Sequence, residues 1–248
     1  MSPEPNLRAA ALDSAASMII PAHVGIIMDG NGRWAEKRKL IRSQGHLEGL
    51  KAAKRIVKAA SDAGVRFLTL YVFSTENWKR ASEEVGFIMG LVKQYLRGEL
   101  DFYRENHIRI RHAGDPAGLP PDIARELESA CRETCSFSGL QVILALNYGG
   151  RDEIVRAARK ILDAAGNGGM PLITEKTFHS FLDNPDVPDP DLIIRSAGEY
   201  RTSNFLLWEG AYSEYYVSDI LWPDWTETEF DGALKAYRER GRKFGGAR

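Results

Sequence analysis

Residues 23–35, HVGIIMDGNGRWA, decide how this fold is predicted. The stretch runs from an apolar segment directly into an aspartate, two glycines and an arginine. A short apolar run that ends at glycines is typical of a buried strand, and the polar turn after it is typical of a connection to a helix. We therefore predict a strand at residues 24–28 and a helix at residues 34–39, joined by the turn.

The same order of apolar strand, polar turn and helix recurs along the chain, without an internal repeat. This alternation predicts an α/β fold with a central, mostly parallel sheet of about six strands flanked by helices. Strands are predicted at residues 24–28, 67–73, 108–112, 141–146, 192–194 and 215–217, and helices at 34–39, 47–63, 85–106, 121–135, 152–164 and 227–240.

Length and composition favour one domain. A chain of 248 residues with 44% hydrophobic content can bury one substantial core. We expect a flexible N-terminal tail at residues 1–18 and a single folded domain at residues 19–248. No apolar run is long enough for a signal peptide or a spanning helix, which predicts a cytoplasmic protein.

The charges and the cysteines exclude some classes of function. The 33 basic and 34 acidic residues leave a net charge of −1, which gives no footprint for nucleic acid. Cys131 and Cys135 have no nearby Cys or His pair to complete a zinc site, so we expect both to be small buried side chains.

Unusual polar residues follow four of the predicted strands. In open parallel sheets, ligands bind beyond the carboxyl ends of the strands, so these segments are expected to meet at one rim. The segments are DGNGR at 29–33, STENWKR at 74–80, NYGGR at 147–151 and RSAGEYRTSN at 195–204.

The first of these segments predicts a phosphate site. Gly30 and Gly32 allow close approach of the backbone to a ligand, and Arg33 and Arg42 supply planar cations that hold phosphate oxygens. A plain turn between strand and helix would also favour glycine, so this alternative stays open. The basic run at residues 37–39 is expected to be a solvated helix face.

A second basic group, Arg195 and Arg201 with the hydroxyl of Ser203, could hold another polyanion, which suggests two phosphorylated substrates. Asp29 would repel a phosphate unless a cation lay between them, and Mg²⁺ is the natural bridge. A helix N-cap or a turn explains an aspartate equally well. The chain lacks the Gly-Lys-Ser/Thr of a P-loop, and G-x-G-x-x-G is absent after the first strand.

Five segments together resemble the cis-prenyltransferases, the family of bacterial undecaprenyl diphosphate synthase. They are HVGIIMDGNGRWA, LTLYVFSTENWKR, NYGGR, IIRSAGEYRTSNFLLW and SEYYVSDILWPD, in the expected order and spacing. The resemblance implies a homodimeric enzyme that uses Mg²⁺. It would add isopentenyl diphosphate units to an allylic diphosphate such as farnesyl diphosphate, giving a long cis-polyprenyl diphosphate such as the undecaprenyl carrier for cell-wall synthesis.

The resemblance also assigns roles to residues. Asp29 and Glu214 would be metal-associated carboxylates, and Asp29 and Asn77 would act in catalysis. Asn77 is treated as the proton acceptor in the family, but a neutral carboxamide is a poor base, so we expect it to orient a phosphate oxygen or water. Substrate binding is assigned to Gly30, Asn31, Gly32, Arg33, Trp34, Arg42, His46, Ser74, Thr75, Glu76, Trp78, Arg80, Arg195, Arg201, Thr202 and Ser203.

The family fold implies a hydrophobic tunnel, here between the sheet and the helix at residues 85–106. Val72 and Leu146 are bulkier than the alanines expected near the tunnel wall. Release of a lipid product implies peripheral contact with a membrane. Two alternatives remain: a non-catalytic partner subunit of a prenyltransferase, and a different phosphate-binding enzyme with a doubly wound sheet.

Overall fold

The computed structural model describes residues 20–166 and 172–240, so the predicted tail at residues 1–18 lies outside the described residues. One sheet of six strands forms the centre, in the order β3-β4-β2-β1-β5-β6, and every neighbouring pair is parallel. The predicted α/β fold is confirmed. The strands are β1 His23–Ile27, β2 Phe67–Ser74, β3 Arg109–Ala113, β4 Gln141–Tyr148, β5 Leu192–Arg195 and β6 Glu214–Val217.

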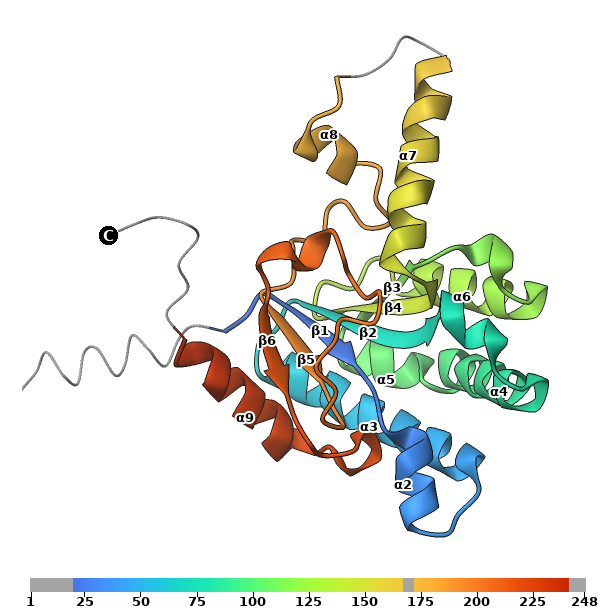
Figure 1. Ribbon diagram of the computed structural model, residues 1–248, viewed down its shortest axis with the longest axis vertical. Coiled ribbons are helices and arrows are strands. Elements are labelled where there is room, and N and C mark those ends of the chain that lie inside the picture. The colour runs from blue at the N-terminus through green and yellow to red at the C-terminus, as the bar shows by residue number, and fades with distance from the viewer. Residues whose placement is uncertain (1–19, 167–171, 241–248) are drawn as a thin grey trace, which may run out of the picture.

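The helices connect these strands, as the alternating pattern predicts (Figure 1). They are α2 Asn31–Lys37, α3 Arg42–Asp62, α4 Ser82–Gly98, α5 Leu100–Glu105, α6 Pro121–Glu133, α7 Gly150–Gly166, α8 Glu175–His179 and α9 Glu227–Arg238. Four short 3₁₀ turns complete the described elements: η1 Thr75–Lys79, η2 Pro116–Gly118, η3 Glu209–Tyr212 and η4 Trp222–Asp224.

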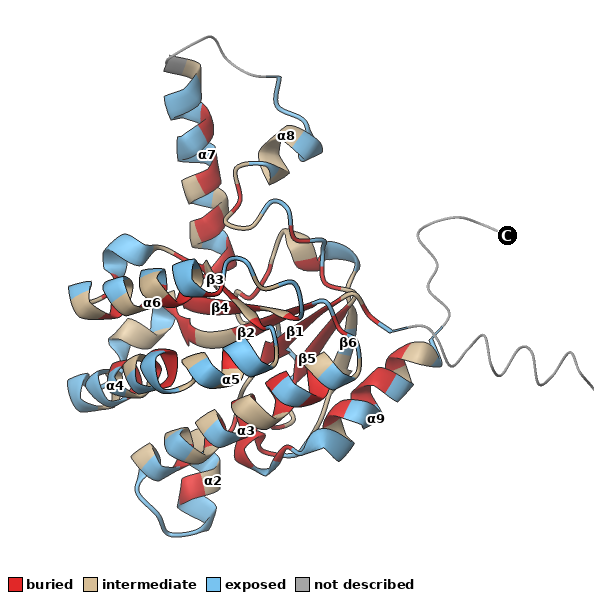
Figure 2. Ribbon diagram, turned by 180° about the vertical axis from the view of Figure 1, so that it is seen from behind, coloured by how far each residue is buried: buried red, intermediate tan, exposed pale blue. Residues whose placement is uncertain are grey.

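The central strands are apolar because helices and loops cover both faces of the sheet. All five residues of β1 are buried, as is typical of a parallel strand with neighbours on both sides. The larger core cluster packs the sheet against α3, α4, α6 and α9, and Figure 2 shows α3, α4 and α9 on one face. A smaller cluster, which includes Ile27, Tyr148 and Phe205, fills the other face.

The predicted long helix at residues 85–106 is wrong as a single element. The structure divides it into α4 and α5, with Glu99 between them at φ −108° and ψ 7°. Gly98 is a poor helix former at this point. Glu99 also forms an ion pair at 2.6 Å with Lys54 of α3, so the break brings its carboxylate to a neighbouring helix.

The sheet order places a crevice beside the end of β1. On one side of β1 the sheet continues through β2, β4 and the edge strand β3, whereas β5 and β6 lie on the other side. Such a switch point leaves an opening beyond the carboxyl ends of the two strands that meet there. Asp29 follows β1 and Arg195 ends β5, so both lie at this opening.

Two further expectations are tested by burial and by helix composition. Cys131 is partly buried, but Cys135 is exposed, so the prediction that both are buried is wrong for Cys135. Across residues 20–166 and 172–240, none of the helices combines the length and the apolar character needed to span a bilayer.

Candidate active site

A polar pocket of about 660 Å³ opens at the switch point. It collects residues from the segments after β1, β2 and β5 and from the start of α3. Fourteen of the residues assigned from the sequence line it: Asp29, Gly30, Asn31, Gly32, Arg33, Arg42, His46, Ser74, Glu76, Asn77, Arg80, Arg195, Arg201 and Ser203.

Asp29 is held firmly through its backbone and its carboxylate. Ser196 accepts a hydrogen bond from the Asp29 N–H at 2.9 Å and donates one to the Asp29 carbonyl at 2.8 Å. The carboxylate accepts from the Gly30 N–H at 2.7 Å and from Arg195 at 2.9 Å. Ser196 was not among the predicted site residues, although its place beside Arg195 in the sequence was a usable signal.

The turn after Asp29 requires its glycine. Gly30 has φ 105°, a conformation that residues with a Cβ rarely adopt, and a Cβ there would lie 2.9 Å from Leu221. Gly32 lies under the guanidinium of Arg42, which a Cβ would meet at 3.1 Å. The two glycines therefore let the backbone turn tightly beside two arginines, as the phosphate hypothesis requires.

Arg195 is the buried centre of the second basic group, with a side chain only 5% exposed. Its guanidinium donates to the Ser203 hydroxyl at 2.7 Å and to the Arg201 carbonyl. Glu199 lies between Arg33 and Arg201 and pairs with both, at 3.5 Å from Arg33. This acid joins the two predicted anion sites, and the residue assignments had omitted it.

The loop that carries Ser203 has a strained backbone at two consecutive residues. Ser203 and Asn204 have φ values of 49° and 65°, in the left-handed region that few residues other than glycine adopt. Tyr71 donates to the Ser203 carbonyl at 3.2 Å, and Asn204 donates to the Glu76 carboxylate at 2.8 Å. These contacts fix the loop and tie it to the segment after β2.

Glu84, at the first turn of α4, does not line the pocket but contacts three residues that do, Arg42, His46 and Arg80. Its Oε1 accepts from Arg80 at 3.0 Å and from Arg42 at 3.1 Å, and lies 3.1 Å from His46 Nε2. Burial opposes charge on Glu84, but the hydrogen bond to His46 and the two arginines hold its pKa below the ordinary value. Burial lowers the pKa of His46, although Glu84 opposes this change. No motif marked Glu84 in the sequence.

The segment after β2 folds as the short turn η1. Its start is closed by Asn77, whose Oδ1 accepts from the Ser74 N–H at 3.1 Å. Trp78 points inward: its indole donates to Asn147 at 2.7 Å and meets Phe73 edge-on, with 4.8 Å between ring centroids. Trp78 therefore anchors this turn to the sheet.

Five of the predicted site residues do not line the polar pocket: Trp34, Thr75, Trp78, Thr202 and Glu214. Trp34 instead donates to Asp224 at 2.6 Å and lies under Arg38, whose guanidinium is 4.2 Å from the ring centroid. The structure thus does not bring Trp34 to the predicted position at the start of an allylic chain.

Glu214 begins the edge strand β6 and lies at the amino end of the parallel strands, whereas Asp29 lies beyond the carboxyl end of β1. The strand register aligns Glu214 with Leu192 and Leu192 with Val24, five positions before Asp29 along the strand direction. At about 3.3 Å per residue, this separates the two carboxylates by roughly 16 Å along the strands alone. Glu214 pairs with Arg240 at 2.9 Å. One chain therefore does not place Glu214 and Asp29 around a common metal ion.

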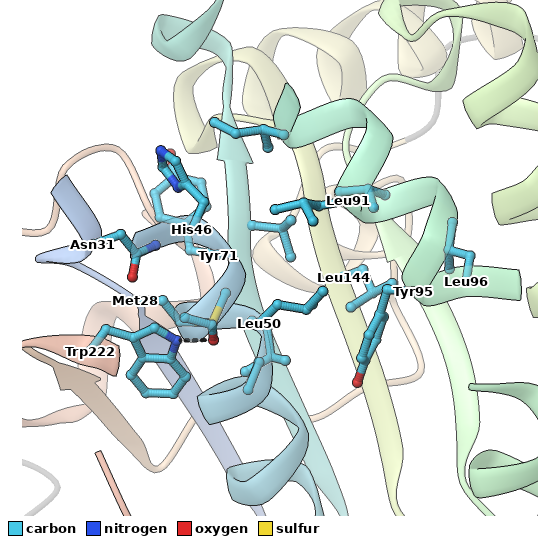
Figure 3. A pocket seen from close by; sticks show the side chains of 16 residues that line it. Met28, Asn31, His46, Leu50, Tyr71, Leu91, Tyr95, Leu96, Leu144 and Trp222 are labelled. Atoms are coloured by element: carbon cyan, nitrogen blue, oxygen red, sulfur yellow. Dashed lines mark hydrogen bonds between the residues drawn. The ribbon is translucent and has the colours of Figure 1, made fainter. Parts of the chain in front are cut away.

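An apolar cavity of about 110 Å³ adjoins the polar pocket. It lies between α3, α4 and strands β2 and β4, and Figure 3 shows Leu50, Leu144 and Tyr95 converging there. Val72 lines the cavity as expected, whereas Leu146 does not and is fully buried. Six residues line both spaces: Met28, Asn31, His46, Tyr71, Val72 and Ile88.

The donor set around Asp29 fits Mg²⁺ that arrives together with phosphate. Within the described part of the chain, no three His, Cys, Asp or Glu side chains are grouped as a metal site. Mg²⁺ is commonly held by one or two carboxylates plus substrate phosphates and water, and does not need a complete protein cage. The Asp29 side chain is 32% exposed to the pocket, so its carboxylate remains accessible to such an ion.

Known proteins share both the sequence and the fold. The family description "Putative undecaprenyl diphosphate synthase" matches residues 27–245. The isoprenyl transferase of Treponema denticola is 51% identical over 225 residues, covering 91% of this chain and 97% of that protein. The isoprenyl transferase of Bacillus subtilis is 47% identical, covering 92% of this chain and 88% of that protein.

Two solved structures are also similar. Lavandulyl diphosphate synthase from Lavandula x intermedia, in complex with dimethylallyl diphosphate, superposes with a TM-score of 0.89 at 36% identity. The match covers 92% of this chain and 99% of that one. A probable undecaprenyl diphosphate synthase from Campylobacter jejuni gives 0.78 at 33% identity, covering 92% and 100%.

The parallel sheet, the arginine-lined polar pocket and the adjoining apolar cavity are the arrangement expected of an α/β enzyme whose substrate has a charged head and an apolar tail. The comparisons make this specific: the chain belongs to the undecaprenyl diphosphate synthase family of isoprenyl transferases. The resemblance to the cis-prenyltransferases that the sequence shows is confirmed.

Proposed function

We propose that the chain condenses isopentenyl diphosphate with an allylic diphosphate, such as farnesyl diphosphate, in successive additions that each create a cis double bond. The observation that carries this proposal is the junction of the polar pocket with the apolar cavity, through six shared lining residues. A substrate with a diphosphate head and a hydrocarbon tail has one end suited to each space.

The two basic groups would bind the two diphosphates. Arg33 and Arg42, beside the turn at Gly30, would hold the allylic diphosphate next to the apolar cavity. Arg195 and Arg201, with Ser203, would hold isopentenyl diphosphate on the β5 side. Each charge-assisted hydrogen bond contributes about 1.5–3 kcal/mol, so several together suffice to fix both heads.

Asp29 is the residue that would hold Mg²⁺, which, when bound, offsets negative charge on the departing diphosphate. Ser196 fixes the backbone of Asp29, and this restricts where its carboxylate can point. Arg195 contributes positive charge to the same diphosphate-binding rim. These groups favour breaking of the allylic C–O bond, after which the isopentenyl double bond attacks the allylic carbon.

Asn77 would position the proton transfer and not accept the proton itself. The carboxamide oxygen of Asn77 already accepts from the Ser74 N–H, which leaves its NH₂ group free to donate. That group can orient a diphosphate oxygen or a water, and either is a better proton acceptor than a neutral amide.

The hydrocarbon tail would grow into the apolar cavity and turn it into a tunnel. A cavity of roughly 150 Å³ holds one benzene molecule. The 110 Å³ present here is smaller, so growth to a long chain requires the cavity to widen. Leu91 and Val92 both line the cavity from α4, so an outward shift of this one helix would widen the cavity.

We further propose that the product is a long-chain polyprenyl diphosphate, such as the undecaprenyl carrier for cell-wall synthesis, made by a cytoplasmic homodimer. The membership in this family supports these assignments. Because Glu214 lies far from Asp29 in its own chain, its predicted role as a metal-associated carboxylate is retained only for an arrangement across two chains.

The test is elongation by the purified protein. Labelled isopentenyl diphosphate, farnesyl diphosphate and Mg²⁺ are incubated with the protein, and the lipid product is extracted and separated by chain length. Formation of polyprenyl product that stops with chelator supports the proposal. Binding of both diphosphates without turnover would instead support a non-catalytic partner subunit, and hydrolysis alone would support a different phosphate enzyme.

A further inference from the structure

Asn204 joins the three polar segments that follow β2, β4 and β5. It belongs to the segment after β5 and lines the polar pocket, although the sequence assigned it no role. Its hydrogen bonds reach Gly150 and Arg151 after β4 and Glu76 after β2. One residue therefore connects the carboxyl ends of three strands.

On the β4 side, Asn204 caps the start of α7. The first N–H groups of a helix have no partner within the helix. The Asn204 carbonyl accepts from the Gly150 N–H at 2.7 Å, and Asn204 Oδ1 accepts from the Arg151 N–H at 2.9 Å. The start of α7 therefore holds the loop of Ser203 from one side.

On the β2 side, Asn204 binds the turn η1. Its Nδ2 donates to the Glu76 carboxylate at 2.8 Å. Burial opposes charge on this carboxylate, but hydrogen bonds from its own backbone and from Asn204 hold the pKa of Glu76 below the ordinary value. The bond is therefore charge-assisted, which is the stronger kind.

Asn77 lies between two fixed points of η1. Glu76, the residue before it, is bound to Asn204, and Trp78, the residue after it, is bound to Asn147 at 2.7 Å. A turn held at a single point can pivot about that point. The two bonds together therefore set both the position and the orientation of the Asn77 side chain.

Among short side chains, asparagine alone meets the demands of position 204. The backbone there has φ 65°, a left-handed conformation that asparagine adopts more readily than most residues with a Cβ. The Arg151 N–H requires an acceptor and the Glu76 carboxylate requires a donor, and one amide group carries both. Aspartate keeps the acceptor but lacks the donor.

The first glycine of the segment NYGGR makes room for this contact. A Cβ on Gly149 would lie 2.6 Å from Thr75 Oγ1 and 2.7 Å from Asn204 Nδ2. The bare backbone at Gly149 therefore lets η1 and the loop of Ser203 approach each other beside it. None of residues 147–151 lines the polar pocket, so the diphosphate sites do not explain this segment, whereas the contact with Asn204 does.

We propose that Asn204 is a positioning residue that fixes η1, with Asn77, against the loop that carries Ser203. The inference rests on the proposed function, in which Ser203 helps to bind isopentenyl diphosphate and Asn77 orients the acceptor of its proton. Asn204 acts on this step through Glu76. The bond keeps the group that orients proton transfer at a fixed place relative to the substrate that loses the proton.

Asn204→Asp tests the bond to Glu76 without removing the cap of α7. The variant keeps an acceptor for Arg151 and places a negative charge against Glu76. At saturating isopentenyl diphosphate, we expect kcat for elongation to fall at least about tenfold, the scale of one hydrogen bond to a charged group. The KM for farnesyl diphosphate should stay within about twofold of the parent, because Arg33 and Arg42 are untouched. Urea unfolding checks that the variant is folded in the assay.

Reversing the direction of the bond separates positioning from a general loss of structure. When Asn204→Asp is combined with Glu76→Gln, the introduced amide can donate to the introduced carboxylate, and the pair keeps a single negative charge. This double variant should regain at least about threefold in kcat over Asn204→Asp, because a hydrogen bond replaces a repulsion. Gln94→Glu makes the same change from amide to acid at an exposed residue of α4 and should elongate like the parent.

Hydrogen exchange follows the same contact without turnover. The backbone amides of residues 75–80 should exchange at least about threefold faster in Asn204→Asp than in the parent, because η1 loses one of its two anchors. The double variant should return toward the exchange of the parent, and Gln94→Glu should match the parent.

The inference is overturned if Asn204→Asp keeps kcat within about twofold of an active parent, or if residues 75–80 exchange equally in both. It is also overturned if the double variant recovers nothing over Asn204→Asp. A parent that does not elongate would refute the proposed function, whereas the exchange measurement would still decide whether Asn204 fixes η1. The two failures are therefore distinguishable.

Discussion

Arg195 donates a hydrogen bond from Nη2 to Oδ2 of Asp29 across 2.9 Å, although the two residues are 166 positions apart in the chain. They stand at the ends of β5 and β1, which are neighbours in the sheet. The predicted anion-binding arginine and the predicted metal-binding acid therefore form one unit.

Replacing Asp29 by Ala should lower turnover at least about 100-fold, the scale expected when a major electrostatic contact with the transition state is removed. Steady-state elongation with farnesyl diphosphate and saturating Mg²⁺ measures this. Lys37→Ala and Lys39→Ala, which change exposed charges that do not line the pocket, should leave turnover on detergent-dispersed substrate nearly unchanged. Near-normal turnover by Asp29→Ala would refute the metal assignment.

Replacing Arg195 by Lys should raise the KM for isopentenyl diphosphate at least about tenfold, because a lysine cannot reproduce the planar fork. In the parent, this fork reaches Asp29 and Ser203 at the same time. Arg66→Lys, an exposed arginine at the other end of β2, is the matched control. A KM within twofold of the parent would contradict the assignment of this arginine to the second diphosphate.

The small residues of α3 should be essential for placing Asn31. A Cβ on Gly49 would lie 2.4 Å from the Asn31 side-chain oxygen, so Gly49→Ala should destabilise the fold by about 1–3 kcal/mol and lower activity. Gly90 of α4 is exposed, and a Cβ there would meet nothing within 4 Å. Gly90→Ala should therefore stabilise the fold, by about 0.4–1 kcal/mol. Urea unfolding of both variants checks the opposite signs, and equal signs would contradict the packing described.

His23 should make the fold less stable in acid. Burial lowers the pKa of His23 to about 4, against 6.5 for the free side chain, and its ring nitrogens lie 2.6 Å from the Pro188 carbonyl and 2.8 Å from Thr69 Oγ1. The unfolded chain therefore binds a proton first, and stability is lost as the pH falls from about 6.5 to about 4.

The full loss from His23 is about 3 kcal/mol, because each unit of pKa difference is worth about 1.4 kcal/mol. His23→Gln should weaken the fold at pH 7 but reduce the dependence of its unfolding free energy on pH across this range. His179→Gln, on the short helix α8, should keep the parent's dependence. Parallel curves for His23→Gln and the parent would contradict the prediction.

Glu209 should make the fold less stable as the pH rises from about 4.5 to about 8. Burial and the negative charge of Glu153 raise the pKa of Glu209 to about 8, and its buried Oε2 has no hydrogen-bond partner among the described residues. The folded chain therefore keeps a proton that the unfolded chain releases near 4.5, so stability is lost as the pH rises from about 4.5 to about 8. Tyr148, Asp183, Arg156 and Asp189 are the other titratable groups around this pair.

A neutral amide at this position should remove that loss. Glu209→Gln is expected to be more stable than the parent at pH 8.5, and the gain should shrink at pH 5, as thermal unfolding at both values would show. Glu105→Gln on α5, which changes an exposed glutamate, should show no such dependence. A gain for Glu209→Gln of equal size at both pH values would contradict the assignment.

Much of this architecture follows from local pattern. The central strands were predictable because each is a short apolar run between turn residues, and the edge strand β3, RIRHA, was predictable from its alternation of polar and apolar residues. The convergence of the polar segments followed from parallel strands, whose carboxyl ends share one edge. Asp29, Arg195 and Ser203 could therefore be placed together although no local signal connects them.

Other features depend on contacts that sequence position does not encode. Glu84 is one acid in a helix with several, and only the packing of α3 against α4 brings it to Arg42 and His46. Trp34 was assigned to substrate by resemblance, but Asp224, far away in sequence, takes its indole N–H. Glu214 was assigned to the metal by resemblance, but within this chain the strand register keeps it away from Asp29 and it pairs with Arg240.

The pairing of β1 with β5 has a consequence for synthesis of the protein. A chain growing from its N-terminus presents the glycine-rich turn long before the strand that completes the crevice has emerged. Contacts between such distant positions form slowly, because a long loop must close first. Truncated and unfinished chains are thus expected to be inert toward both isoprenoids, and activity should arise abruptly once the ribosome has released the last strands.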